Sequence, residues 1–190
     1  ALVYRARHRI LGSTHALKIL KPHLAASEEL RERFLAEGRI QARIKHPNIV
    51  EVTGVVVEPG VAGLVMTFLD GPTLTERIDE GPLSVEAVGA MMLPLLSGVA
   101  AVHDLGIVHR DLKPDNIKLL ADDKPVLFDF GVARLISESA QQEVGHRKRF
   151  KTRAGRRMGT PGYMSPEQVE GSPLVDARTD VFALGCILYE

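Results

Sequence analysis

Cysteine is nearly absent from this chain, since Cys186 is the only one in 190 residues. A single cysteine excludes an internal disulfide framework and is typical of a reducing compartment. An excess of one charge is also absent, because 24 Lys and Arg residues balance 24 Asp and Glu residues. The field of the whole molecule therefore favours neither nucleic acid nor a membrane as partner.

Long hydrophobic runs are missing as well. The longest apolar stretches lie around 89–102 and 181–189, and both are too short to span a bilayer. We recognise no signal peptide, no internal repeat and no low-complexity linker. The chain begins in a strand-like sequence at Ala1 and stops inside a helical pattern at Glu190, so we expect a fragment of a longer protein.

The first third of the sequence favours strands around one helix. The predicted strands cover 1–9, 14–20, 49–58 and 63–68. A helix is predicted over 27–45, because Ser27 is a suitable N-cap and acidic residues fill the first turn. The turn-forming sequence DGP at 70–72 then predicts a boundary between two lobes.

The rest of the chain favours helices. The predicted elements are a helix from Ser84 to about His103, short strands near 117–120 and 125–128, and a helix from about Asp180. Pro94 lies well inside the first helix and is expected to kink or split it, because proline removes a backbone hydrogen bond. Strands first and helices second predict an α+β fold with two segregated lobes.

One polar loop, HRDLKPDN at 109–116, carries a high density of functional groups. A carboxylate at Asp111 could accept a proton from a hydroxyl, and the ammonium of Lys113 could neutralise a transferring phosphate. Asn116 offers a neutral oxygen ligand for Mg²⁺. Asp129 follows a short apolar strand and precedes a glycine, a suitable place to hold a hard divalent cation.

A second candidate phosphate clamp lies upstream. Lys18 is in the strand HALKIL and Glu37 is on the predicted helix, so a helical carboxylate could hold the ammonium in place. Each of these elements alone is a weak signal, since single motif matches produce many false positives. Their combination, in this order and on these element types, excludes coincidence.

Together these motifs resemble the catalytic core of a eukaryotic-type protein Ser/Thr kinase, in a bacterial form. HALKIL resembles the lysine strand of that family, HRDLKPDN its catalytic loop and DFG its metal-binding turn. GTPGYMSPEQ at 159–168 resembles the end of the activation segment, and DVFALG at 180–185 the start of the helix that anchors the large lobe. The resemblance implies a bilobal kinase fold: a small antiparallel sheet with one helix, and a larger helical lobe.

The resemblance also implies roles in catalysis. Asp111 would orient and deprotonate the substrate hydroxyl, and Lys113 would stabilise the charge of the transferred phosphoryl group. Asn116 and Asp129 would bind Mg²⁺ or Mn²⁺. Thr160 would donate a hydrogen bond near Asp111 and Lys113, an arrangement that implies Ser/Thr specificity.

For ATP, the resemblance implies that Lys18 holds the α- and β-phosphates and pairs with Glu37. The residues expected around the adenine are Val3, Ala16, Met66, Thr67, Phe68, Leu69 and Lys118. Lys118 stands where the family usually has an apolar residue under the base. Two interpretations stay open: its stem lies under the base, or it is a solvated strand lysine.

The family pattern divides the chain into an N-lobe over 1–68, without the first strand and glycine-rich loop, and a C-lobe over 69–190, truncated in its last helix. His109 is expected to pack in the core and not to act as a base. Glu167 is expected to lack a partner, because the arginine that normally pairs with it would lie beyond Glu190.

A basic stretch, GHRKRFKTRAGRR at 145–157, contains seven Lys and Arg residues and no acid. It could be a solvated, disordered loop, or it could dock acidic substrates or an acidic regulator. Nucleic-acid binding is disfavoured because no aromatic platform accompanies the charges. Within this stretch Thr152 is a candidate for autophosphorylation, with Arg110 as the partner of the phosphate; Thr160 is a second candidate.

The predicted function is ATP-dependent phosphorylation of Ser and Thr in proteins, activated by autophosphorylation. A pseudokinase scaffold and a small-molecule kinase are the alternatives. The resemblance further implies a cytoplasmic domain, like that of the membrane-anchored kinases in this group, and pairing of two copies through their N-lobes. We expect no nucleic acid partner and no membrane contact within this segment.

Overall fold

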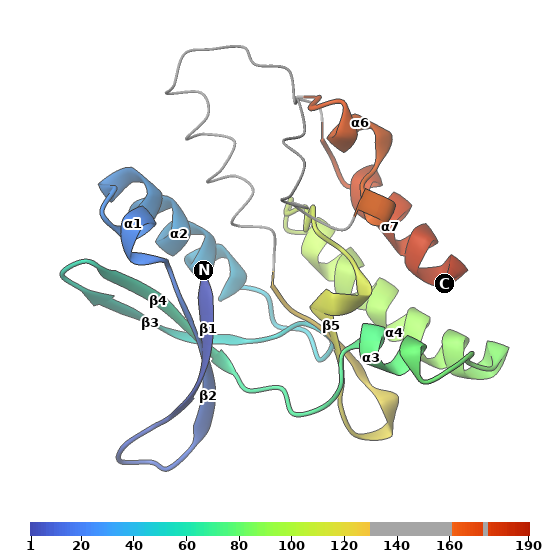
Figure 1. Cartoon of the computed structure of the whole chain (residues 1–190), viewed down its shortest axis with the longest axis horizontal. Coiled ribbons are helices and arrows are strands. Elements are labelled where there is room, and N and C mark those ends of the chain that lie inside the picture. Colours follow the sequence, from blue (N-terminus) through green and yellow to red (C-terminus); the bar gives the residue numbers. More distant parts are fainter. Residues whose placement is uncertain (130–160, 173–174) are drawn as a thin grey trace.

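The computed structural model describes residues 1–129, 161–172 and 175–190, which form a sheet lobe and a mainly helical lobe (Figure 1). The sheet lobe has four antiparallel strands in the order β1-β2-β4-β3. Their bounds are Leu2–Arg7 for β1, Thr14–Ile19 for β2, Val52–Glu58 for β3 and Val61–Thr67 for β4. The predicted α+β class and the predicted strands are confirmed.

Two helices pack against the sheet: α1 (Pro22–Ala25), which was not predicted, and α2 (Glu28–Gln41). Ser27 caps α2 as predicted, because its hydroxyl accepts a hydrogen bond from the Leu30 amide at 3.4 Å. Gly38 permits close packing on β4, since a Cβ atom there would lie 2.2 Å from Leu64 Cδ2. The prediction of helix to residue 45 was too long: a turn follows Gln41 and directs Ile44 into the core.

A linker after β4 leads to α3 (Leu74–Asp79), a short helix that we did not predict. Thr73 and Glu76 form a capping box at its start. The Thr73 hydroxyl accepts from the Glu76 amide at 3.2 Å, and the Glu76 carboxylate accepts from the Thr73 amide at 2.6 Å. Two orphan amides are thereby satisfied, which allows a helix of less than two turns to form.

Helix α4 (Val85–His103) is the longest element of the helical lobe. It begins at the predicted cap, Ser84, and continues through Pro94, so the predicted split into two helices does not occur. Buried side chains on both sides of the proline, Met91 and Leu95 among them, hold the turns together. Among the described residues α4 is the one helix long and apolar enough to cross a membrane, a test that a core helix also passes.

A two-stranded sheet, β5 (Ile117–Leu119) and β6 (Pro125–Leu127), lies between the sheet lobe and α4. The Leu127 amide donates to Asn48 O at 2.8 Å and its carbonyl accepts from the Val50 amide at 2.9 Å. The segment that leads into β3 is therefore hydrogen-bonded to β6. This pairing fixes the position of Phe128 and Asp129, which follow β6 directly.

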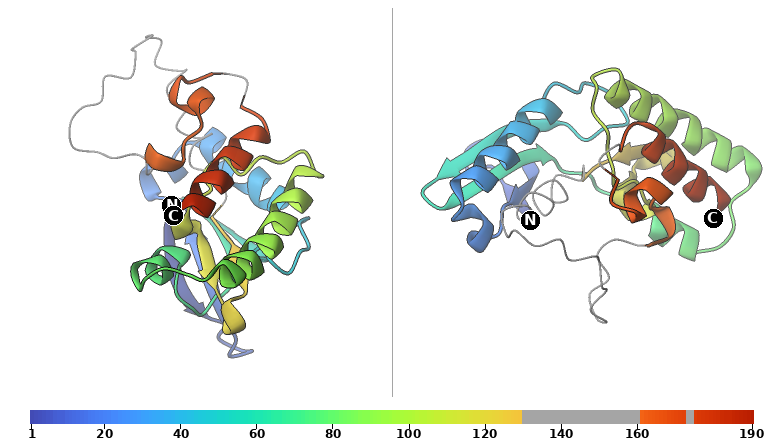
Figure 2. Two further views of the ribbon diagram at one scale, coloured as in Figure 1. Left: turned by 90° about the vertical axis from the view of Figure 1, so that its right-hand side faces the viewer. Right: turned by 90° about the horizontal axis from the view of Figure 1, so that it is seen from above.

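The last described elements are a short helix, α6 (Pro166–Val169), and α7 (Arg178–Tyr189). Helix α7 lies beside α4, as both views show (Figure 2). Its buried residues Ala183, Leu184 and Ile187 belong to the same core cluster as the inner face of α4. The first turn of α7 also carries a buried carboxylate, Asp180, at 0% exposure.

Candidate active site

Asp180 binds the backbone of the polar loop at 109–116. Its carboxylate accepts hydrogen bonds from the backbone amides of His109 and Arg110, each at 2.8 Å, and lies 2.8 Å from His103 Nε2. A buried carboxylate needs such donors, because an unpaired buried charge is very costly. The backbone of Arg110 adopts a left-handed conformation, with φ of 66°. The loop is thus held in a specific, sparsely populated shape by a residue 70 positions away in the sequence.

His109 packs in the core, as predicted, and is 1% exposed. Its Nδ1 accepts a hydrogen bond from the Asp111 amide at 3.3 Å, so the proton is on Nε2, which lies 3.4 Å from Phe128 O. Burial lowers the pKa of His109 and keeps the ring neutral. The imidazole therefore links the Asp111 backbone to the residue before Asp129.

Asp111, Lys113 and Asn116 converge as predicted. The Asn116 amide nitrogen donates to Asp111 O at 2.7 Å and to Asp111 Oδ2 at 3.1 Å. Lys113 Nζ lies 3.9 Å from the same carboxylate oxygen. Because the side-chain nitrogen of Asn116 faces Asp111, the side-chain oxygen of Asn116, Oδ1, is the atom that remains for a cation.

Asp129 joins this group through the backbone. The Phe128 amide donates to Asn116 O at 2.9 Å, so the residue before Asp129 is hydrogen-bonded to the loop. The carboxylate of Asp129 forms an ion pair with Lys18 on β2. Oxygen ligands at Asn116 and Asp129 fit a hard divalent cation. The described residues contain no cluster of three or more His, Cys, Asp and Glu that could hold a metal.

The predicted ion pair between Lys18 and Glu37 is not formed, because the ammonium of Lys18 is bound to Asp129. Glu37 Oε2 is buried and finds no hydrogen-bond partner in the described part of the chain. Burial raises the pKa of Glu37 from 4.5 to about 7, against the opposing charge of Lys18. The Asp129 side chain is 43% exposed and keeps much of its hydration, whereas the buried Glu37 carboxylate must give up hydration to be charged.

This raised pKa predicts a pH-dependent contribution to stability. The native state holds a proton on Glu37 between about pH 4.5 and 7 where the unfolded chain does not, so stability falls as pH rises through that window. We expect E37Q to remove this fall and to gain about 1–3 °C in melting temperature over the parent between pH 5 and 7.5. The measurement is a series of thermal melts, with E32Q, on an exposed position of α2, as the matched control. Parallel curves for parent and E37Q across that range would contradict the assignment.

Most of the residues expected around the adenine are neighbours in the sheet or in the linker that follows it. In the sheet, Val3 pairs with Lys18 and Ala16 pairs with Met66. Met66 belongs to a small apolar cluster with Val50, Val52 and Val126, against which Ala16, Leu69 and Phe128 pack. Thr67 and Phe68 continue this region into the linker.

Lys118 contacts the linker that follows β4. It is half-buried in β5, and its Nζ donates to Gly71 O in the linker at 2.6 Å. This hydrogen bond disfavours the interpretation as a solvated strand lysine. The alternative, a stem lying under a base, remains a prediction.

The residues predicted within the activation segment are described only in part. Thr152, Thr160 and the basic stretch at 145–157 lie outside the described residues. Glu167, expected to lack a partner, has one: Thr179 Oγ1 donates to its carboxylate at 2.7 Å. Hydrogen bonding to Thr179 is the largest cause that lowers the pKa of Glu167.

Sequence reasoning missed the residues that support the loop. Asp180 was assigned only to a helix start, and Gln168, whose amide donates to Arg110 O at 2.8 Å, was not singled out. The available signal was a carboxylate at the start of an apolar helical pattern, since such a group needs buried donors.

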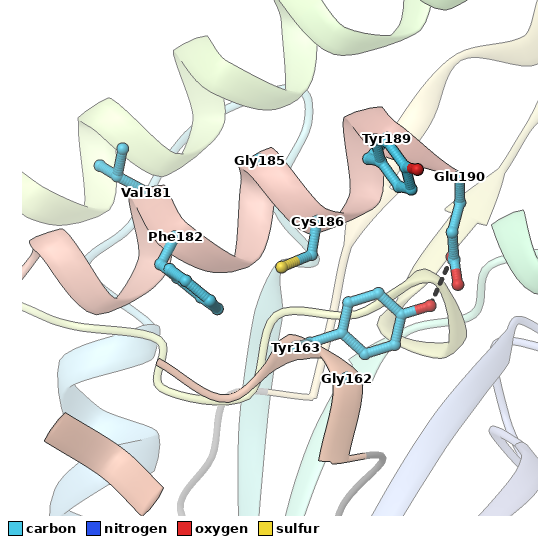
Figure 3. Close-up of a pocket in the computed structure, with 8 residues that line it drawn as sticks. All are labelled: Gly162, Tyr163, Val181, Phe182, Gly185, Cys186, Tyr189 and Glu190. Carbon is cyan, nitrogen blue, oxygen red and sulfur yellow. Dashed lines mark hydrogen bonds between the residues drawn. The ribbon is translucent and has the colours of Figure 1, made fainter. Parts of the chain in front are cut away.

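A cavity of about 550 Å³ lies away from this site, between Tyr163 and the outer face of α7 (Figure 3). Phe182 and Cys186 line it, and the Tyr163 hydroxyl donates to the carboxylate of Glu190. Burial, first, and the neighbouring Glu190 raise the pKa of Tyr163. None of the residues that converge around Asp111 line this cavity.

Comparison with known proteins agrees with this geometry. The chain matches the protein kinase domain family over residues 1–190. It is 40% identical to the serine/threonine-protein kinase PkaA of Streptomyces coelicolor over 94% of this chain, and to Pkn1 of Myxococcus xanthus over 99%. It covers 32% and 26% of those two proteins, so it spans a third or less of their length.

Solved structures show the same fold. The kinase domain of Mycobacterium tuberculosis PknI superposes with a TM-score of 0.72 at 29% identity, covering 98% of this chain and 65% of that one. The chain therefore belongs to the protein kinase family, with a bilobal fold and relatives that are bacterial serine/threonine kinases.

Proposed function

We propose that this chain is the catalytic core of an enzyme that transfers a phosphoryl group from ATP to Ser and Thr hydroxyls of proteins. The observation that carries the proposal is the convergence of Asp111, Lys113 and Asn116, with Asp129 and Lys18 paired beside them. Carboxylate and amide oxygens suit Mg²⁺ or Mn²⁺, and ammonium groups suit phosphates. ATP would supply the phosphoryl group, and the metal ion would neutralise part of the phosphate charge.

Asp111 would accept the proton of the attacking hydroxyl. Its backbone amide is bound to His109 and its carboxylate to Asn116, so the base is oriented before a substrate arrives. Lys113, 3.9 Å from Asp111 Oδ2, adds positive charge where the phosphoryl oxygens would develop negative charge. Lys18 would leave Asp129 to contact the phosphates, and Glu37 is the nearby carboxylate that could then receive it.

The wider assignments follow from this activity. We assign residues 1–68 to the N-lobe and 69–190 to the C-lobe. Protein substrates and a cytoplasmic location are proposed because the relatives are bacterial protein kinases. Pairing of two copies through their N-lobes is a proposal of the same kind.

The test is phosphate transfer by the full-length protein. Incubation with γ-labelled ATP, Mg²⁺ and a basic protein should give label on Ser and Thr, and chelation of the metal should abolish it. Nucleotide binding without any transfer would favour the pseudokinase alternative. Asp111, Asn116, Lys18 and Asp129 argue against that alternative, since all four are present and in contact in pairs.

Autophosphorylation is proposed as the activating step, with Thr152 as the acceptor and Arg110 as a contact of the phosphate. After incubation with Mg²⁺ and ATP, mass spectrometry should find phosphate on Thr152. T152A should lower kcat about tenfold or more, because the activation segment would lose an ordering contact. T152A with full activity would contradict this step without affecting the proposed transfer.

A further inference from the structure

Lys118 occupies the middle of β5, a strand whose two other side chains are fully buried. Ile117 and Leu119 are 0% and 1% exposed, and side chains alternate along a strand, so Lys118 projects from the opposite face. There it is half-buried, and its ammonium donates to the Gly71 carbonyl at 2.6 Å. Among the described residues this is the only hydrogen-bond partner of the ammonium.

The bond adds to backbone pairing that holds the linker against β5. Thr73 forms a β-bridge with Lys118, and the Leu119 amide donates to Pro72 O at 2.9 Å. Gly71 permits this approach, because a Cβ atom at that position would lie 1.9 Å from Leu119 O. Any side chain at Gly71 would push the linker away from the strand.

A second cation holds the linker from the side of the sheet lobe. The Arg5 guanidinium on β1 lies 4.9 Å from the centre of the Phe68 ring, within cation–π range. Arg5 pairs with Ala16 across the hairpin, so it belongs to the same sheet as Val3 and Ala16, two residues expected around the adenine. One cation from each lobe therefore contacts the linker: Arg5 contacts Phe68, and Lys118 contacts Gly71.

We propose that Lys118 is a positioning residue for the nucleotide: by binding the Gly71 carbonyl it fixes the linker, and by the same bond it holds its stem along the floor of the site. This inference rests on the proposed function, in which ATP would bind with its adenine beside the linker residues Thr67, Phe68 and Leu69. A linker ordered in advance loses less conformational freedom on binding. Lys118 therefore acts on nucleotide affinity, and Arg5 acts on it through the same segment.

The test replaces Lys118 with methionine, which keeps the length and apolar stem but removes the ammonium. In the full-length protein, K118M should weaken binding of ADP about three- to tenfold by calorimetry. The KM for ATP should rise by a similar factor, while kcat falls much less. Hydrogen exchange at the linker amides over 68–71 should become faster. K118R, which can still donate to the carbonyl, should restore most of the affinity.

The matched control is K124M, at an exposed position of the turn between β5 and β6. It should leave ADP affinity and linker exchange unchanged. A double-mutant cycle with R5M adds a second test: if both cations act through the linker, their effects on ADP affinity should not add. R9M, at an exposed position near the hairpin turn, is the control for R5M.

Unchanged ADP affinity or unchanged linker exchange in K118M would overturn the inference. A parent protein that binds no ADP would overturn both the inference and the proposed function. A parent that binds ADP but transfers no phosphate would overturn the proposed catalysis alone, because affinity and exchange are measured without turnover.

Discussion

Replacing Asp111 with asparagine is expected to lower kcat about a thousandfold, because the site would lose the group that we propose as the acceptor of the substrate proton. An asparagine is nearly the same size, and its oxygen can still accept the hydrogen bond that Asn116 donates at 3.1 Å. The fold and the nucleotide affinity should therefore be retained. The measurement is phosphate transfer at saturating ATP, together with ADP binding and a thermal melt.

The control for this change is D115N, which alters an exposed carboxylate in the same loop. It should stay within about threefold of the parent, since surface substitutions seldom have large effects. D111N activity within tenfold of the parent would show that Asp111 is not the proton acceptor. Equal losses in D111N and D115N would point to the overall charge of the loop instead.

Replacing Asp180 with asparagine is expected to give the largest loss of stability. Its carboxylate is fully buried and lies within 2.8 Å of the His103 ring nitrogen and of the His109 and Arg110 amides. An amide group in its place offers one oxygen and turns an NH₂ group toward donors. We expect a loss of about 3–5 kcal/mol in the free energy of unfolding, as for other broken buried charge networks.

Denaturant unfolding of the full-length protein measures this loss, with D176N as the control. Asp176 is close in sequence, but it binds Arg178 at the surface, and exposed pairs contribute little. The polar loop should also lose its shape, so D180N should lower activity beyond its effect on stability. A D180N protein with the stability and activity of the parent would show that the loop is held by other contacts.

Much of the fold could be predicted because local signals and tertiary packing agree. Ser27 and Ser84 are capping residues in the sequence and cap helices in the structure. Helix α3 was not predicted because its six residues are too few to show a helical period, and only the capping box at Thr73 marks its start. Helix α4 is not split at Pro94, because packing on both sides of the proline outweighs the lost hydrogen bond.

The catalytic loop could be predicted because its residues are neighbours in the sequence. That Lys18 pairs with Asp129 and not with Glu37 could not be predicted, since the pairing depends on how far each carboxylate is buried. The contact of Lys118 with Gly71 could not be predicted either. It joins residues 47 positions apart, and its acceptor is a backbone carbonyl, which no sequence pattern marks. The same holds for Asp180, whose donors lie about 70 positions away.

The central claim is that Asn116 and Asp129 provide the metal ligands of a phosphoryl-transfer site beside Asp111. A crystal structure of the protein with Mg²⁺ and a non-hydrolysable ATP analogue tests it most directly. We predict a metal ion bound by the side-chain oxygens of Asn116 and Asp129, with Lys18 moved from Asp129 to the phosphates. A metal ion held elsewhere, or a nucleotide bound with Lys18 still paired to Asp129, would contradict the account.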